Sequence, residues 1–138
     1  MAKLTIQEFN NILSQGVLVY DGAMGTNLIA QQLKSEDYGG KDGCSEALNL
    51  YCPESVCKVH KDFLKAGCQV IETNTFGGTR ITLKEYGMAD KVAEINKKAV
   101  EIAKKAIADM GKNVRIPVHL IDEINSYNKT YSLLFQKL

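Results

Sequence analysis

The chain has 138 residues, of which 45% are hydrophobic and 24% are charged, a balance typical of one globular domain of ordinary size. Its formal net charge of +1 provides no broad field for nucleic acid or an anionic membrane, so we expect neither as a partner. No apolar run approaches the roughly 20 residues that a membrane span needs, and the amino terminus lacks the apolar core of a signal peptide. These features predict a cytoplasmic protein.

The four cysteines do not form a C-x-x-C pair, and no histidine stands at a zinc-finger spacing from them. Disulfide frameworks are uncommon in cytosolic chains of this size. We therefore expect four reduced thiols, some of them buried, at Cys44, Cys52, Cys57 and Cys68.

The first predicted element is a helix that begins near Thr5 and ends before Gly16. Thr5-Ile6-Gln7-Glu8 has the form of a capping box, and apolar residues then recur at helical spacing. In a barrel, such a helix is able to plug the end opposite the active rim. We interpret it instead as a packing helix without a chemical role.

The stretch that organises the chain is residues 17–26, Val-Leu-Val-Tyr-Asp-Gly-Ala-Met-Gly-Thr. Its first four residues predict a buried strand, with Asp21 at the carboxyl end, which faces the ligand in α/β proteins. Gly22 and Gly25 would let backbone N–H groups approach an anion, so a carboxylate beside exposed amides suits an amino acid. The alternative is that Asp21 caps the following helix.

A short helix is predicted at residues 27–33, followed by a mobile loop at 34–45 that is either a lid or a solvated connection. The next predicted helix has Pro53 in its first turn and ends at Gly67. His60 lies on the apolar stripe of this helix, and we interpret it as a satisfied core histidine rather than a ligand.

A second strand is predicted at residues 70–73, and it runs into a polar loop whose Asn74 and Thr75 would line the same rim as Asp21. Glu72 would point into the barrel mouth or pair with a buried cation. Arg80 would hold a carboxylate, remain solvated or pair with a neighbouring acid. Two strand-and-loop units with helices between them suggest βα repeats that feed one rim of a barrel.

The rest of the chain predicts two helices, a third strand and a tail. A short helix spans residues 79–86, and a longer one, capped by Asp90, ends at Gly111. On its outer face we expect Glu94–Lys98 and Glu101–Lys105 ion pairs.

The third predicted strand, at residues 114–120, contains Pro117, which favours an edge or irregular strand. The tail from 121 to 138 predicts a weak helix or disorder.

Three separated motifs carry a family resemblance, namely residues 21–26 (DGAMGT), 46–50 (EALNL) and 72–77 (ETNTFG). In order and spacing they resemble the homocysteine-binding domain of the homocysteine S-methyltransferases, most closely the start of the cobalamin-dependent methionine synthases. The resemblance implies an α/β fold, with the first two to three βα units of a (β/α)8 TIM barrel and an N-terminal helix in residues 1–120, then a divergent tail at 121–138. Because such a barrel takes about 250 residues, the chain corresponds to the first part of one.

The resemblance also implies an activity, which is methyl transfer to the homocysteine thiol to give methionine. In this family a zinc ion, held by three cysteines from late strands, makes the thiol a thiolate, and methylcobalamin or a sulfonium supplies the methyl group. This chain has no Cys-Cys pair, so no metal role transfers to its cysteines. We expect neither zinc nor methylcobalamin to bind this chain alone.

The amino-acid pocket does transfer residue by residue. The resemblance implies that Asp21 holds the substrate ammonium group and that the amides of Gly22 and Ala23 receive its carboxylate. Asn74 and Thr75 correspond to the rim after the second strand.

We therefore predict an N-terminal fragment of a homocysteine S-methyltransferase that carries part of the homocysteine pocket and is inactive by itself. The alternative is a non-catalytic truncated or split protein whose partner supplies the rest of the barrel. An open barrel edge would then favour self-association. A third possibility is an isolated homocysteine-binding module.

Overall fold

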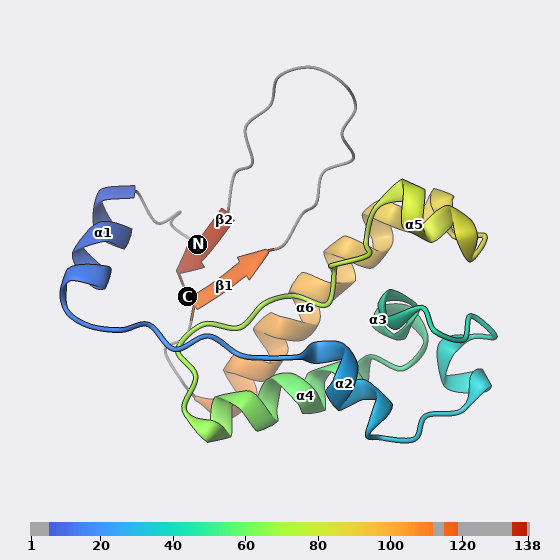
Figure 1. The fold of residues 1–138 in the computed structure, drawn as a ribbon, viewed down its shortest axis with the longest axis horizontal. Helices are drawn as coiled ribbons and strands as arrows, with labels where there is room; N and C mark the ends of the chain where they lie inside the picture. The colour runs from blue at the N-terminus through green and yellow to red at the C-terminus, as the bar shows by residue number, and fades with distance from the viewer. Residues whose placement is uncertain (1–5, 112–114, 119–133, 138) are drawn as a thin grey trace, which may run out of the picture.

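A computed structural model gives the fold of residues 6–111, 115–118 and 134–137, which are mostly helical (Figure 1). The helices are α1 (Ile6–Ser14), α2 (Met24–Ile29), α3 (Leu48–Tyr51), α4 (Pro53–Ala66), α5 (Arg80–Glu85) and α6 (Val92–Met110). Short 3₁₀-helices are η1 (Ser35–Tyr38), η2 (Ser45–Ala47) and η3 (Ala89–Lys91). Two strands, β1 (Arg115–Val118) and β2 (Leu134–Lys137), pair antiparallel.

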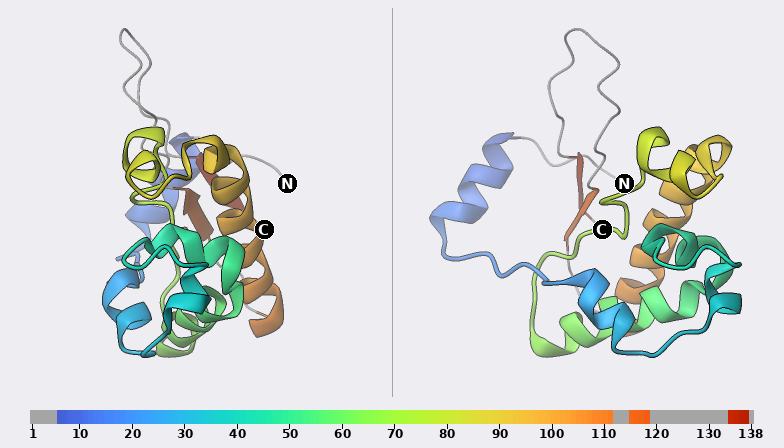
Figure 2. Two further views of the ribbon diagram at one scale, coloured as in Figure 1. Left: turned by 90° about the vertical axis from the view of Figure 1, so that its right-hand side faces the viewer. Right: turned by 45° about the vertical axis from the view of Figure 1, so that its right-hand side comes forward.

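Helices α4 and α6 lie side by side and form the main core (Figures 1 and 2). Pro53 stands in the first turn of α4, and Gly67 ends that helix with a φ of 104°, as predicted. Gly111 ends α6 in the same left-handed conformation. Each fully buried aliphatic side chain contributes about 2 kcal/mol to folding. The aliphatic residues between α4 and α6 include Val56, Val59, Leu64, Ile102, Ala106 and Ile107.

A second, smaller core attaches the segments around the site to the start of α6. Leu83 of α5 and Met88 pack with Ala47 of η2 and Ile95 of α6, and all four are buried. This cluster fixes η2 against α6, and η2 carries one wall of the cavity described below.

The two strands predicted at residues 17–20 and 70–73 are reduced to one parallel bridge, between Tyr20 and Val70. The N–H groups of Gln69 and Val70 both donate to the same oxygen, that of Val19, at 2.8 and 3.2 Å. The N–H of Val19 donates to the side-chain oxygen Oε1 of Gln69. A side-chain bond and a shared carbonyl replace the regular hydrogen-bond ladder between these segments. The pairing therefore does not extend beyond a single bridge.

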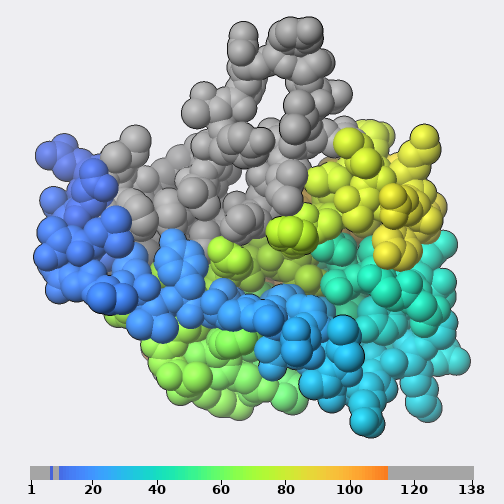
Figure 3. Space-filling view, in the orientation of Figure 1, coloured from blue at the N-terminus to red at the C-terminus, as the bar shows by residue number. Residues whose placement is uncertain are grey.

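The expected burial of the first strand is also wrong. Val17 is 86% exposed and Val19 is 52% exposed. Figure 3 shows this blue segment crossing one face of the molecule. The segment separates α1 from the other helices (Figure 2). The segment is therefore held by backbone contacts on one side, without a second apolar layer over these valines.

Several local predictions differ from the structure in their details. Helix α2 begins at Met24, three residues earlier than the predicted start. The cap of α6 is Lys91 rather than Asp90, and it makes no side-chain bond to the helix. On α6, Lys98 pairs with Glu101 and Lys105 pairs with Asp109, so the predicted i,i+4 partners are wrong.

The segment predicted as a mobile loop has a defined local conformation. It contains η1, where the N–H of Lys34 donates to Asp37 at 2.8 Å and the Ser35 hydroxyl bonds Asp42 at 2.7 Å. Gly39 has a φ of 61°, and a Cβ there would lie 2.7 Å from the ring of Tyr51. Close packing thus requires glycine at this turn.

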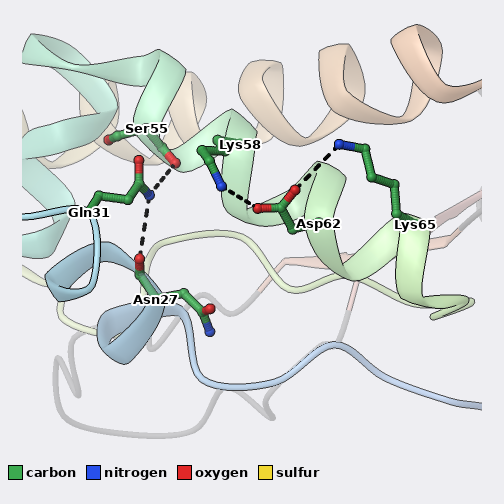
Figure 4. A network of polar contacts seen from close by, with 6 residues as sticks. All are labelled: Asn27, Gln31, Ser55, Lys58, Asp62 and Lys65. Carbon is green, nitrogen blue, oxygen red and sulfur yellow. Dashed lines mark hydrogen bonds and ion pairs between the residues drawn. The ribbon is translucent and has the colours of Figure 1, made fainter.

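Polar contacts connect α2 with α4 and cover the outer face of α4 (Figure 4). The side-chain amide of Gln31 donates to the carbonyl of Ser55 at 3.1 Å. Asp62 lies between Lys58 and Lys65, and all three are largely exposed. Such exposed pairs contribute only about 0–1 kcal/mol, so the apolar core stabilises this region.

The cysteines, the third strand, the tail and the start of the first helix have different outcomes. All four cysteines are free and buried, as predicted.

Part of the third predicted strand exists as β1, which contains Pro117. The tail prediction is wrong for Leu134–Lys137, because β2 satisfies backbone groups of β1. Thr5 lies outside the described residues, and no described helix is long and apolar enough to cross a bilayer.

His60 is a core residue, as predicted, but it is not satisfied. It is fully buried, and neither ring nitrogen has a hydrogen-bond partner within the described ranges. Burial lowers the pKa of His60 from 6.5 to about 4. The neutral ring is therefore the form that the fold accommodates.

This burial predicts a loss of stability in mild acid. Below pH 6.5 the unfolded chain binds a proton at His60 that the folded chain does not, so the free energy of unfolding falls as pH drops toward 4. The shift corresponds to about 3 kcal/mol over this window. Denaturant unfolding of wild type and His60→Leu measures it as the difference between the two curves.

Comparing the two proteins is necessary because the titration of Asp21 changes the free energy of unfolding in the opposite direction. Its pKa is raised from 3.8 to about 7, so its contribution to stability falls as pH rises between these values. Both proteins keep Asp21, so subtraction removes this contribution. A flat difference curve between pH 6.5 and 4 would contradict the burial account of His60.

Candidate functional site

A cavity of about 330 Å³ lies between the loop that follows Tyr20 and the loop that follows Val70. The parallel bridge between Tyr20 and Val70 brings these two loops to the same place. All five predicted site residues line this cavity: Asp21, Gly22, Ala23, Asn74 and Thr75. The other lining residues are Met24, Gly25, Ser45, Glu46, Glu72, Thr73 and Phe76. Of the predicted loop at 34–45, only its last residue, Ser45, lines the cavity, and the choice between a lid and a solvated connection stays a prediction.

Asp21 connects the two loops. Its N–H donates to the carbonyl of Val70 at 2.9 Å, and its Oδ2 accepts the N–H of Glu72 at 3.0 Å. The cap of α2 is Ala23, without a side-chain bond. The alternative of Asp21 as a helix cap is therefore wrong, and its carboxylate is turned across to the second loop.

The carboxyl group of Asp21 is poorly solvated. Its pKa is raised from 3.8 to about 7, chiefly by burial and also by the nearby charge of Glu72, while the hydrogen bond from the N–H of Glu72 opposes the shift. In the described part of the chain no cation pairs with Asp21. A cationic group that entered the cavity would therefore favour the ionised form of Asp21.

Backbone amides without acceptors lie beside this carboxyl group. Within the described residues, the N–H groups of Gly22 and Ala23 donate to no acceptor. Gly22 packs against α4, where a Cβ would lie 3.2 Å from the ring of Phe63. The cavity therefore pairs a carboxyl group with N–H donors, which suits a ligand that carries both an ammonium and a carboxylate.

The side chains of Asn74 and Thr75 are used inside the protein. Asn74 donates to the carbonyl of Ser45 at 2.7 Å and to Asn49 Oδ1 at 3.1 Å, and Asn49 donates to the carbonyl of Asn74 at 2.8 Å. The hydroxyl of Thr75 bonds that of Thr73 at 2.8 Å. These two predicted residues thus shape the cavity wall, with the Asn74 side-chain nitrogen and the Thr75 hydroxyl already engaged.

The sequence assigned no role to Glu46, which lines the cavity, or to Asn49, which supports the cavity wall through Asn74. Glu46 is only 7% exposed, and its Oε1 accepts the N–H of Gly77 at 2.6 Å. Asn49 holds the second loop through Asn74. Both belong to the 46–50 motif. The sequence feature that could have indicated them is a carboxylate and an amide side chain within a family motif. Phe76, which is 78% exposed, adds an apolar rim.

The second loop is also held from α6. Asn96 donates to the carbonyl of Gly78 and to that of Val92, both at 2.8 Å. A Cβ on Gly78 would lie 2.8 Å from Asn96 Oδ1 and 3.0 Å from the carbonyl of Thr75. Only glycine fits this turn without displacing the Asn96 side chain or the loop backbone.

A larger hollow, of about 440 Å³, lies over α4 and α6. Four lysines line it, and all of them are paired with Asp62 or Asp109: Lys58, Lys61, Lys65 and Lys105. Its charged groups already have partners, whereas Asp21 and the amides beside it lack them. We therefore place the candidate site at the smaller cavity.

No metal centre is built from the described residues, which contain no group of three or more His, Cys, Asp or Glu arranged to hold an ion. The four buried cysteines are divided between the two apolar clusters. The residues in hand do not fit a zinc ion, and we assign none of them a metal role.

Comparison with known proteins identifies the family. The sequence signature of the family described as Homocysteine S-methyltransferase matches residues 18–137. The chain belongs to the homocysteine S-methyltransferase family. The match includes residues beyond 120, and the predicted division into residues 1–120 and 121–138 stays a prediction.

Relatives within the homocysteine S-methyltransferases include two mycobacterial proteins. The methionine synthase of Mycobacterium tuberculosis is 39% identical over 101 residues, and that of Mycobacterium leprae is 39% identical over 97 residues. These matches cover 73% and 70% of this chain but only 8% of each relative. The chain thus spans about 8% of the length of the curated relatives it matches.

A solved structure shares the fold. The homocysteine methyltransferase MmuM of Escherichia coli, in its metallated form, aligns with a TM-score of 0.62 at 24% identity. The alignment covers 80% of this chain and 40% of that chain.

The glycine at position 78 gives a test of how tightly the second loop is held. Gly78→Ala is expected to lower the free energy of unfolding by about 1–3 kcal/mol, because its Cβ would collide with Asn96 and with backbone. The matched control is Gly25→Ala, where a Cβ would meet nothing within 4 Å and would favour helix α2. Equal stability of the two variants, measured in denaturant, would contradict this packing.

Proposed function

We propose that this chain recognises homocysteine within a (β/α)8 barrel that transfers a methyl group to the homocysteine thiol and yields methionine. One observation carries the proposal: a poorly solvated carboxyl group, Asp21, and two N–H groups without described acceptors face one cavity. An amino acid supplies a cation and an anion on one carbon atom, which matches this arrangement. The family membership names homocysteine among amino acids.

In the proposed complex, the ammonium group of homocysteine bonds the carboxylate of Asp21. The substrate carboxylate receives the N–H groups of Gly22 and Ala23, at the start of α2, where the backbone carries a positive partial charge. Asn74 and Thr75 form the wall through their internal bonds. Phe76 offers apolar surface to the substrate side chain.

We propose that the chain by itself binds the substrate and does not transfer the methyl group. Its identified groups are binding groups, and none of the described residues is assigned to thiol activation. In the family that task falls to zinc, with methylcobalamin among the donors, and both remain proposals for the whole protein. A cytoplasmic location also remains a prediction.

Homocysteine binding should depend on Asp21 and on pH. As pH rises from 6 to 8, Asp21 ionises near 7, so affinity for the ammonium group is expected to rise by up to about tenfold. Asp21→Asn is expected to weaken binding at pH 8 at least about tenfold, near 1.4 kcal/mol, and to remove this pH dependence. Calorimetry with reduced homocysteine measures both effects.

The control for this experiment is Asp62→Asn, which removes an exposed carboxylate from α4, outside the cavity. Its affinity should equal that of wild type. If Asp21→Asn binds homocysteine as tightly as wild type, with the same pH profile, the proposed site is wrong.

The alternative function is a non-catalytic chain that assembles with a partner or with itself. The observation that favours it is the exposed pair Val17 and Val19 beside the single parallel bridge. Exposed apolar side chains along a strand edge promote association. Sedimentation at micromolar concentration is expected to show concentration-dependent mass for wild type and less of it for Val17→Lys; a monomer throughout would eliminate self-association.

A further inference from the structure

Glu46 is the most deeply buried charged group of the cavity wall. It lies in η2, it is 7% exposed, and it lines the same cavity as Asp21. Its Oε1 accepts the N–H of Gly77 at 2.6 Å, and Gly77 leaves no room for a side chain, since a Cβ would lie 3.0 Å from that oxygen. The carboxylate is therefore fixed in place by the second loop.

The second oxygen of this carboxylate, Oε2, has no donor within the described residues. Because Glu46 lines the cavity and its Oε1 is engaged by Gly77, Oε2 is the oxygen left for a ligand. None of the residues that line the cavity is a lysine, arginine or histidine. A buried carboxylate without a cation is costly, and a cationic ligand in the cavity would reduce that cost.

Glu46 and Asp21 approach the cavity from different segments. Asp21 follows the first parallel segment, whereas Glu46 comes from η2, which the smaller core holds against α6. The charge of Glu46 therefore reaches the cavity from another side than the charge of Asp21.

We propose that Glu46 is a specificity-determining residue that selects ligands carrying an ammonium group. Its orientation is set by the Gly77 N–H, and its negative charge adds to that of Asp21 in favouring a cation. This inference rests on the proposed function, because it assumes that the cavity holds an amino acid. It assigns Glu46 selectivity between an amino acid and the same acid without its amino group.

The test compares two ligands and two variants. Homocysteine and 4-mercaptobutyrate share the thiol and the carboxylate, but only homocysteine carries an ammonium group. Glu46→Gln keeps an oxygen that accepts the Gly77 N–H and removes the charge. The measured quantity is the ratio of the two dissociation constants, determined by calorimetry at pH 8 for wild type, Glu46→Gln and Asp21→Asn.

In Glu46→Gln we expect the preference for homocysteine to fall about fivefold, as for one charge acting across several ångströms of partly solvated protein. The affinity for 4-mercaptobutyrate should stay the same or increase, since its carboxylate is no longer repelled. A merely structural role for Glu46 would change both affinities together and leave the ratio at the wild-type value.

The variants separate failure of this inference from failure of the proposed function. If Asp21→Asn lowers the ratio and folded Glu46→Gln does not, the role of Glu46 is overturned while the homocysteine site stands. If wild type binds neither ligand, or neither variant changes the ratio, both proposals fail.

A second readout covers the case in which Glu46→Gln does not fold. In the unmodified chain, the side-chain carboxyl ¹³C resonance of Glu46 should move on addition of homocysteine and stay in place with 4-mercaptobutyrate. Equal movement with both ligands, or none with homocysteine, would overturn the inference.

Discussion

The parallel contact between residues 19–21 and 69–72 is the constraint on which the site depends. It consists of the Tyr20–Val70 bridge, the Asp21 N–H bond to the Val70 carbonyl and the Glu72 N–H bond to the Asp21 carboxylate. These few bonds bring together loops that are distant in the chain, since Asp21 and Glu72 are separated by 51 positions. Without them the carboxyl group, the amides and the buried wall would not share one cavity.

The helices were predictable because their signals are local. Apolar spacing, together with Pro53, Gly67 and Gly111, predicted α4 and the end of α6. The strands were not, because an extended segment depends on its neighbours: two N–H groups share the carbonyl of Val19, and a single bridge results. The barrel itself is a prediction from the family, supported by the fold shared with MmuM.

The candidate site was predictable to a similar extent. The motif at residues 21–26 indicated Asp21 and the amides beside it, which face the cavity. The motif at 72–77 indicated Asn74, but its side chain is bonded to Asn49, 25 residues away, and only the folded chain reveals that partner. The role of Glu46 was not predicted for the same reason, because its hydrogen-bond donor, the N–H of Gly77, lies 31 residues further on.

The central claim is that Asp21 and the amides of Gly22 and Ala23 together bind the amino-acid end of homocysteine. Its most direct test is a titration of ¹⁵N-labelled protein with homocysteine, followed by amide resonances. The account predicts that the resonances of Gly22 and Ala23 move most, while those along the outer face of α4 stay in place. Movement confined to α4, or no movement at Gly22 and Ala23 at saturating homocysteine, would contradict it.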